Sequence, residues 1–119
     1  MDSETTIKEL KDAVKNFCGD RDWDQYHNAK DLAIGIITES SELLEHFRFK
    51  SEKEVEEMFK TDKKNEISEE LADVLYFVLR LAQKYDIDLS TELKNKLKKN
   101  ESRYPVEKSK GSNNKYTEL

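Results

Sequence analysis

Two short acidic motifs hold the residues of this sequence whose types and spacing best favour chemistry. Glu39 and Glu42 are separated by two serines, and Glu70 and Asp73 by a leucine and an alanine. Both pairs lie in segments with helical periodicity, in which positions i and i+3 are about 60° apart around the helix axis. Each motif therefore presents two carboxylates in nearly the same direction.

A helical projection places both acidic pairs at the same offset from an apolar stripe. At about 100° per residue, each stripe begins roughly 20° past the first acid of its pair and ends by about 180°, and the second acid falls near 300°. The stripes comprise Leu32, Ala33, Ile36, Ile37, Leu43, Leu44 and Phe47 in the first segment, and Ile67, Leu71, Val74, Leu75, Val78, Leu79, Leu81 and Ala82 in the second. If the stripes pack on each other, the four carboxylates converge at the rim of the interface.

Four carboxylates partly removed from water repel one another unless a cation shares the site. Oxygen ligands suit a hard cation such as Mg²⁺, which can polarise a phosphoryl oxygen and activate a water molecule. Phosphate-ester or phosphoanhydride chemistry is therefore the first hypothesis. The alternative is that the acids are merely solvated, since 26 Asp and Glu among 119 residues supply about five pairs at i and i+3 by chance.

The composition predicts an all-α protein. Charged residues make up 39% of the chain and hydrophobic residues 35%, with only 3 Gly and 1 Pro, and the apolar residues recur every three or four positions. We expect a helical bundle of about five helices, over residues 6–19, 28–47, 51–59, 65–84 and 90–104. Residues 1–105 are predicted to form one domain, followed by a polar C-terminal tail over residues 106–119.

The small apolar share predicts that oligomerisation completes the core, because a small helical monomer with so few apolar residues is marginal. Tyr76 and Phe77 extend the apolar surface beyond the stripe of their helix, which also favours neighbours on more than one side. The net charge of −5 argues against a general nucleic-acid or membrane-surface binder. The absence of a signal peptide or long apolar run, and the single Cys18, lead us to expect a cytoplasmic protein.

Two polar regions offer further candidate residues. Trp23 and Tyr26 either anchor a loop to the core, which is the favoured interpretation, or form a platform for a ring-bearing ligand; His27 is interpreted as preceding the next helix rather than as a ligand or base. Gly35 lies on the same side of its helix as Glu39 and permits a close approach there. Along the last helix, positions i, i+4 and i+8 form a ridge that suits either phosphate binding or ordinary solvation: Lys96, Asn100 and Tyr104.

Taken together, the motifs resemble those of the all-α MazG-type nucleotide pyrophosphohydrolases, in particular the dCTP pyrophosphatase-like branch. The resemblance covers nearly the whole chain. It is carried, in this order, by Arg21-Asp22-Trp23-x-Gln25-Tyr26-His27, Glu39-x-x-Glu42-Leu43, Glu70-Leu71-x-Asp73-Val74, Lys96-x3-Asn100-x2-Arg103-Tyr104-Pro105 and Lys115-Tyr116-Thr117-Glu118-Leu119.

The resemblance implies hydrolysis of a (deoxy)nucleoside triphosphate between the α and β phosphates, giving the monophosphate and pyrophosphate. It implies a homo-oligomer, either dimer or tetramer, and Mg²⁺ held by four carboxylates: Glu39, Glu42, Glu70 and Asp73. It also implies that Trp23, Gln25, Tyr26 and His27 help to enclose the nucleoside. Lys96, Asn100 and Tyr104 are implied to line the phosphate and sugar side.

Three departures from the family pattern bear on base preference. Phe49 stands where a Trp usually stacks on the base, Phe77 where some members have Tyr, and Val14 where some have His. The leading hypothesis is thus an Mg²⁺-dependent pyrophosphohydrolase of dCTP or a related pyrimidine nucleotide, with a role in nucleotide-pool house-cleaning. A same-chemistry rival acts on dUTP or another modified nucleotide, and the alternative from a different class is a non-catalytic helical bundle that binds a nucleotide or a protein.

Overall fold

The computed structural model describes all residues, 1–119, and is entirely helical. It contains six α-helices and two short 3-10 helices, η1 and η2, and no strand. Their bounds are α1 Ile7–Asp20, η1 Asp24–Tyr26, α2 Ala29–Glu45, α3 Glu52–Met58, α4 Lys63–Lys84, α5 Leu89–Arg103, α6 Val106–Ser109 and η2 Tyr116–Glu118. The all-α prediction is confirmed. None of these helices combines the length and the apolarity that a bilayer crossing requires.

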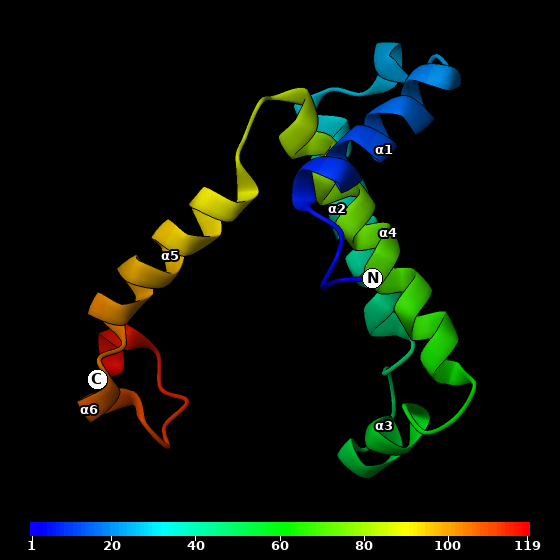
Figure 1. Cartoon of the computed structure of the whole chain (residues 1–119). Helices are drawn as coiled ribbons and strands as arrows, with labels where there is room; N and C mark the ends of the chain where they lie inside the picture. The colour runs from blue at the N-terminus through cyan, green and yellow to red at the C-terminus, as the bar shows by residue number, and fades with distance from the viewer. The chain divides into compact units, whose positions relative to one another are not determined.

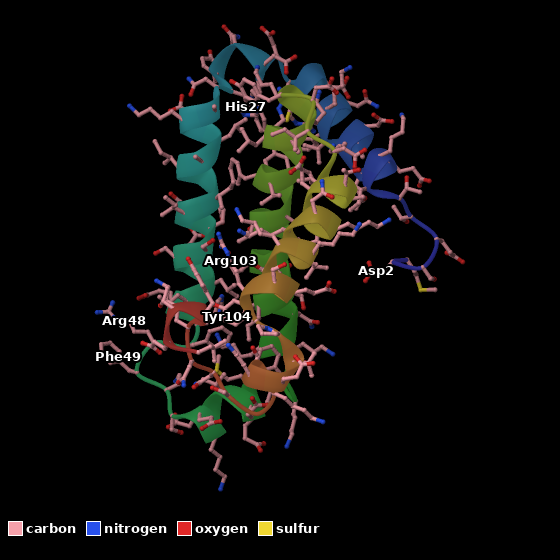
Figure 2. The ribbon with its side chains drawn as sticks, turned by 90° about the vertical axis from the view of Figure 1, so that its left-hand side faces the viewer. Asp2, His27, Arg48, Phe49, Arg103 and Tyr104 are labelled. Carbon is pink, nitrogen blue, oxygen red and sulfur yellow. The ribbon has the colours of Figure 1, made fainter.

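The chain divides into two compact units, residues 1–86 and residues 87–119. In the first unit, α2 and α4 run side by side in opposite directions, and α1 packs on α4 (Figures 1 and 2). The short helix α3 connects α2 to α4 at the end of the pair away from α1 (Figure 1). The second unit contains α5, α6 and η2. The two helices that carry the apolar stripes therefore pack on each other.

Side-chain caps fix where most of these helices begin. The Thr6 hydroxyl accepts a hydrogen bond from the Glu9 backbone N–H, and the Asn28 side chain does the same for Asp31. Ser51 and Glu54 form a reciprocal capping box at the start of α3. Each contact satisfies a backbone donor that the helix itself leaves unpaired.

The start of α5 differs from the range predicted for the last helix, residues 90–104, in which Ser90 would be the N-cap. The Asp88 carboxylate accepts from the Thr91 backbone N–H at 3.0 Å, so Asp88 is the N-cap. Both residue types cap well, and Asp88 is the one that sits three residues before a helical N–H able to reach it. The N-cap thus lies two residues earlier than predicted, and the helix begins at Leu89.

The interior of the single chain is small. Its buried apolar side chains are only Cys18, Leu32, Ile67, Leu79 and Ala82. Several members of the predicted stripes remain open to solvent, with exposed fractions of 71% for Ile37, 65% for Leu44 and 54% for Leu71. The α2–α4 interface therefore uses one side of each stripe and leaves the other side uncovered.

Gly35 permits a close approach between α2 and α4. A Cβ atom added at Gly35 would lie 2.5 Å from two carbons of the Phe77 ring, well inside van der Waals contact. The missing side chain thus forms the notch that accepts the Phe77 ring. The close approach predicted for Gly35 is confirmed, and its partner is an aromatic side chain of α4.

Candidate active site

Three carboxylates from α2 and α4 meet at one point of the first unit. Glu39 projects from α2, and Glu70 and Asp73 project from α4. One oxygen from each carboxylate lies within 4.8 Å of the others. Glu39 and Glu70 are half-buried, whereas Asp73 is exposed. The convergence predicted from the matched helix offsets is thus present for these three residues.

Glu42 lies at the edge of this cluster. Its side chain is exposed, and it shares a hydrogen bond with Glu39 that helps to raise the Glu39 pKa. Burial is the largest cause of that shift, followed by the hydrogen bond to Glu42 and then by the charges of Glu42, Asp73 and Glu70, and together they raise the pKa of Glu39 to about 7. The cluster is therefore short of positive charge at neutral pH.

Two oxygens of the cluster have no hydrogen-bond partner. Glu39 Oε2 and Glu70 Oε2 are both buried and unpaired. Two carboxylates that are both ionised cannot hydrogen-bond to each other, because each can only accept, and an unpaired buried charge is costly. His46 Nε2 lies 3.5 Å from Glu70 Oε1, but it carries a positive charge only when protonated. An all-oxygen set with unpaired buried atoms fits a hard divalent cation.

The loop that connects α1 to α2 contains Trp23 and Tyr26 and places them near the start of α2. The Trp23 ring lies edge-on to Phe17 at 5.6 Å between centroids, yet 38% of Trp23 is exposed. Tyr26 is 64% exposed, and the Gln25 amide donates to the Asp22 carboxylate at 3.0 Å. Trp23 is thus attached to α1 through Phe17 and keeps part of its surface available.

The sequence analysis did not single out Arg80, although it organises this loop. The Arg80 guanidinium forms an ion pair with Asp24 and donates from Nε to His27 Nδ1 at 2.9 Å. The sequence carried one signal, since Arg80 interrupts the apolar run Val78-Leu79-Arg80-Leu81-Ala82. Its partners lie more than 50 positions away in the chain, so no local pattern identifies them.

Phe49 and Phe77 occupy contrasting environments. Phe49 is 90% exposed, follows α2 with a left-handed φ of 62°, and has the Arg48 guanidinium 4.7 Å from its ring centroid. Figure 2 shows Arg48 and Phe49 projecting together from the edge of the ribbon. Phe77 instead lies in the Gly35 notch and contacts Tyr76 edge-on at 5.0 Å. Only Phe49 is free to move onto a ligand without disturbing the α2–α4 interface.

The predicted polar ridge lies on α5 in the second unit. Lys96 is exposed and Asn100 is half-buried. Tyr104 packs edge-on to Tyr116 at 5.8 Å, and the Arg103 guanidinium lies 4.8 Å from the Tyr116 ring centroid; Figure 2 labels Arg103 and Tyr104. The C-terminal Tyr116 therefore folds back onto the end of α5 and restrains Tyr104.

Comparison with known proteins agrees with this combination of an all-helical fold and an acidic cluster between two helices. Residues 34–119 match the MazG-like family. The chain belongs to this family, and the resemblance seen in the sequence is confirmed.

Individual relatives cover nearly all of the chain. It is 34% identical to dCTP pyrophosphatase 1 of Rattus norvegicus over 98% of this chain and 69% of the relative. The identity to dCTP pyrophosphatase 1 of Homo sapiens is 32%, with the same two shares. Among solved structures, a pyrophosphatase from Archaeoglobus fulgidus superposes with a TM-score of 0.79 at 39% identity, over 83% of this chain and 92% of that one.

Proposed function

We propose that this chain hydrolyses dCTP or a related pyrimidine deoxynucleoside triphosphate to the monophosphate and pyrophosphate. The chain is a nucleoside triphosphate pyrophosphohydrolase, as its similarity to proteins named dCTP pyrophosphatase 1 and pyrophosphatase supports. The observation that carries the proposal is the cluster of Glu39, Glu70 and Asp73, in which two buried carboxylate oxygens are unpaired.

Mg²⁺ is the cation proposed for this cluster, with Glu39, Glu42, Glu70 and Asp73 as its ligands. When bound, Mg²⁺ would offset the triphosphate charge and polarise the phosphoryl group under attack. The protein's contribution is a preorganised acidic surface, because α2 and α4 hold three of the carboxylates within 4.8 Å before any ligand binds. Without a cation, burial and the neighbouring acids raise the pKa of Glu39 to about 7.

The remaining predicted residues are proposed to bind the nucleotide. The partly exposed rings of Trp23, Tyr26 and Phe49 suit stacking against a base or sugar. The family resemblance further assigns nucleoside contacts to Gln25, His27 and Phe77, and phosphate and sugar contacts to Lys96, Asn100 and Tyr104. A phenylalanine at position 49 offers less stacking area than the usual tryptophan and no indole N–H, so base preference is the property most open to change.

The active enzyme is proposed to be a homo-oligomer, either a dimer or a tetramer. The support is the small interior of the single chain and the exposed apolar side chains of α2 and α4, among them Ile37 and Leu71. Apolar surface of this kind on a small helical protein favours burial against another subunit.

Incubation with dCTP and Mg²⁺, followed by separation of the products, tests the reaction. We expect dCMP and pyrophosphate. Glu42→Gln and Asp73→Asn should each lower kcat by roughly 100-fold or more, whereas Glu66→Gln, an exposed acid one turn before Glu70 on α4, should leave kcat unchanged. Formation of dCDP and orthophosphate would reject the proposed bond cleavage. No turnover of any nucleotide, with ligand binding insensitive to metal, would favour the non-catalytic alternative.

A further inference from the structure

Arg80 is the one charged side chain buried in this protein. It lies on α4 and is 1% exposed. A buried guanidinium is tolerated only when its donors are paired. Each of the three guanidinium nitrogens of Arg80 donates a hydrogen bond. Besides Asp24 and His27, Arg80 Nη1 donates to Gln83 Oε1 at 2.6 Å. In a chain with so few buried residues, the burial of the Arg80 charge indicates a role other than packing.

Two of the three partners belong to the loop between α1 and α2. Arg80 reaches the Asp24 carboxylate and His27 Nδ1, so it holds the first residue of η1 and the residue that follows η1. Figure 2 shows His27 at the end of the α2–α4 pair where α2 begins. Because Arg80 Nε is a donor, His27 Nδ1 must be the acceptor, which places the proton of the neutral imidazole on Nε2. Arg80 therefore fixes both the position of the loop and the tautomer of His27.

Neighbouring residues at the end of α4 strengthen the same attachment. Lys84 Nζ donates to the Asp24 backbone carbonyl at 3.0 Å, and the Tyr85 hydroxyl accepts from the Ala29 backbone N–H at 2.9 Å. The last turns of α4 thus bind the loop at its middle and at the start of α2. Arg80 is distinguished from these exposed contacts by its burial, since a buried guanidinium that loses a partner cannot readily replace it with water.

The same helix, α4, carries two of the clustered carboxylates, Glu70 and Asp73. Arg80 follows Asp73 by seven residues, which is two helical turns, so both lie on nearly the same face of α4 about 10 Å apart along the axis. A rigid helix of 22 residues therefore connects the loop that contains Trp23 with the carboxylates Glu70 and Asp73. Movement of the loop relative to the cluster requires the ion pair between Arg80 and Asp24 to break.

We propose that Arg80 is a positioning residue that holds the loop of residues 23–27 at a fixed place relative to the carboxylate cluster before the nucleotide binds. This inference rests on the proposed function, in which Trp23 and its neighbours enclose the nucleoside. A preformed loop loses less conformational entropy on binding, so its main effect is on nucleotide affinity. Release of the loop should raise KM more than it lowers kcat.

Trp23 is the single tryptophan of the chain, so its fluorescence reports on the loop independently of activity. The test compares the wild type with Arg80→Met, Arg80→Lys and Asp24→Asn in dCTP hydrolysis with Mg²⁺ and in Trp23 emission without nucleotide. We expect Arg80→Met to raise the KM for dCTP about tenfold, with kcat changed less than about threefold. We also expect it to shift Trp23 emission to longer wavelength and to increase acrylamide quenching.

The other variants separate positioning from general destabilisation. Arg80→Lys keeps the charge but replaces the fork of donors by one ammonium, so it should fall between the wild type and Arg80→Met. Lys63→Met removes an exposed cation of the same helix, which is paired with Glu66, and should change neither KM nor emission. Asp24 is 60% exposed, so Asp24→Asn should keep the helical circular dichroism and carries the test if Arg80→Met does not fold.

The outcomes distinguish this inference from the function on which it rests. Wild-type KM and wild-type Trp23 emission in both Arg80→Met and Asp24→Asn would overturn the positioning role while leaving the hydrolase intact. A loss of thermal stability without any change in KM or emission would also overturn it. If the wild type hydrolyses no nucleotide, the proposed function fails, whereas the emission of the variants still shows whether Arg80 fixes the loop.

Discussion

Glu39 gives the acidic cluster its dependence on pH. Its pKa in the folded chain is about 7, against an ordinary value of 4.5. The folded, metal-free protein therefore binds more protons than the unfolded chain between these two values, and stability falls as pH rises through this window. The full penalty of ionising Glu39 is present above pH 7 in the absence of a cation.

Thermal unfolding with and without Mg²⁺ tests whether the ionisation of Glu39 lowers the stability of the metal-free protein. The Tm of the metal-free wild type should fall between pH 5 and pH 8 relative to that of Glu39→Gln, which has no carboxyl to ionise at this position. Saturating Mg²⁺ should raise the wild-type Tm strongly at pH 8 and little at pH 5, because the metal binds the ionised form. Identical pH profiles for the wild type and Glu39→Gln would contradict the raised pKa.

At the scale of single residues, the sequence spacing predicted the carboxylates of the cluster but did not identify Arg80. Glu39, Glu70 and Asp73 could be predicted because each pair lies within one helical turn and both pairs share one offset from an apolar stripe. Arg80 could not, because its meaning depends on Asp24 and His27, which only the fold brings to it. His27 was correctly placed just before α2, but its hydrogen bond to Arg80 is a tertiary contact.

At the scale of helices, the notch at Gly35 shows packing prevailing over helix propensity. Replacement of an interior helical glycine by alanine ordinarily stabilises a helix by about 0.5–1 kcal/mol. At Gly35 the new methyl group would lie 2.5 Å from the Phe77 ring. We expect Gly35→Ala to lower the free energy of unfolding by about 1–3 kcal/mol, a typical cost of overpacking.

Gly19 provides the matched control, because a Cβ added there meets nothing within 4 Å. Gly19→Ala in α1 should be neutral or slightly stabilising in the same denaturant titration. Adding Phe77→Ala to Gly35→Ala should cost less than the sum of the two single changes, since the smaller side chain vacates the notch. Equal stabilisation by Gly19→Ala and Gly35→Ala would show that the ring moves aside at no cost.

Helix boundaries were predictable where a cap is local and unique. Thr6, Asn28 and Ser51 each offer one oxygen to the backbone N–H three residues ahead, so the sequence alone identifies them. The start of α5 offered two suitable caps, Asp88 and Ser90, and in the structure the Asp88 carboxylate accepts from the Thr91 backbone N–H. The start of α4 has no side-chain cap at Asp62, and the helix accordingly begins two residues before the predicted Asn65.

At the scale of the whole molecule, the apolar stripes are wider than one helix–helix contact can cover. The excess was visible in the sequence as Tyr76 and Phe77 beyond the stripe, but which positions would remain open depends on how α2 and α4 face each other. Ile37, Leu44 and Leu71 are more than half exposed, and burying side chains of this size contributes about 1.5–3 kcal/mol each. A second copy of the chain is the partner that the proposed oligomer supplies.

Sedimentation velocity tests that proposal directly. The wild type should sediment as a species of at least two chains at micromolar concentration. Ile37→Glu and Leu71→Glu should each shift the protein towards the monomer, because a carboxylate buried in an interface costs several kcal/mol. Lys30→Glu adds an acid to an exposed position of α2 without removing an apolar side chain, and should leave the assembly intact. A wild type that sediments as a monomer at every concentration would mean that the exposed apolar surface of α2 and α4 serves something other than self-association.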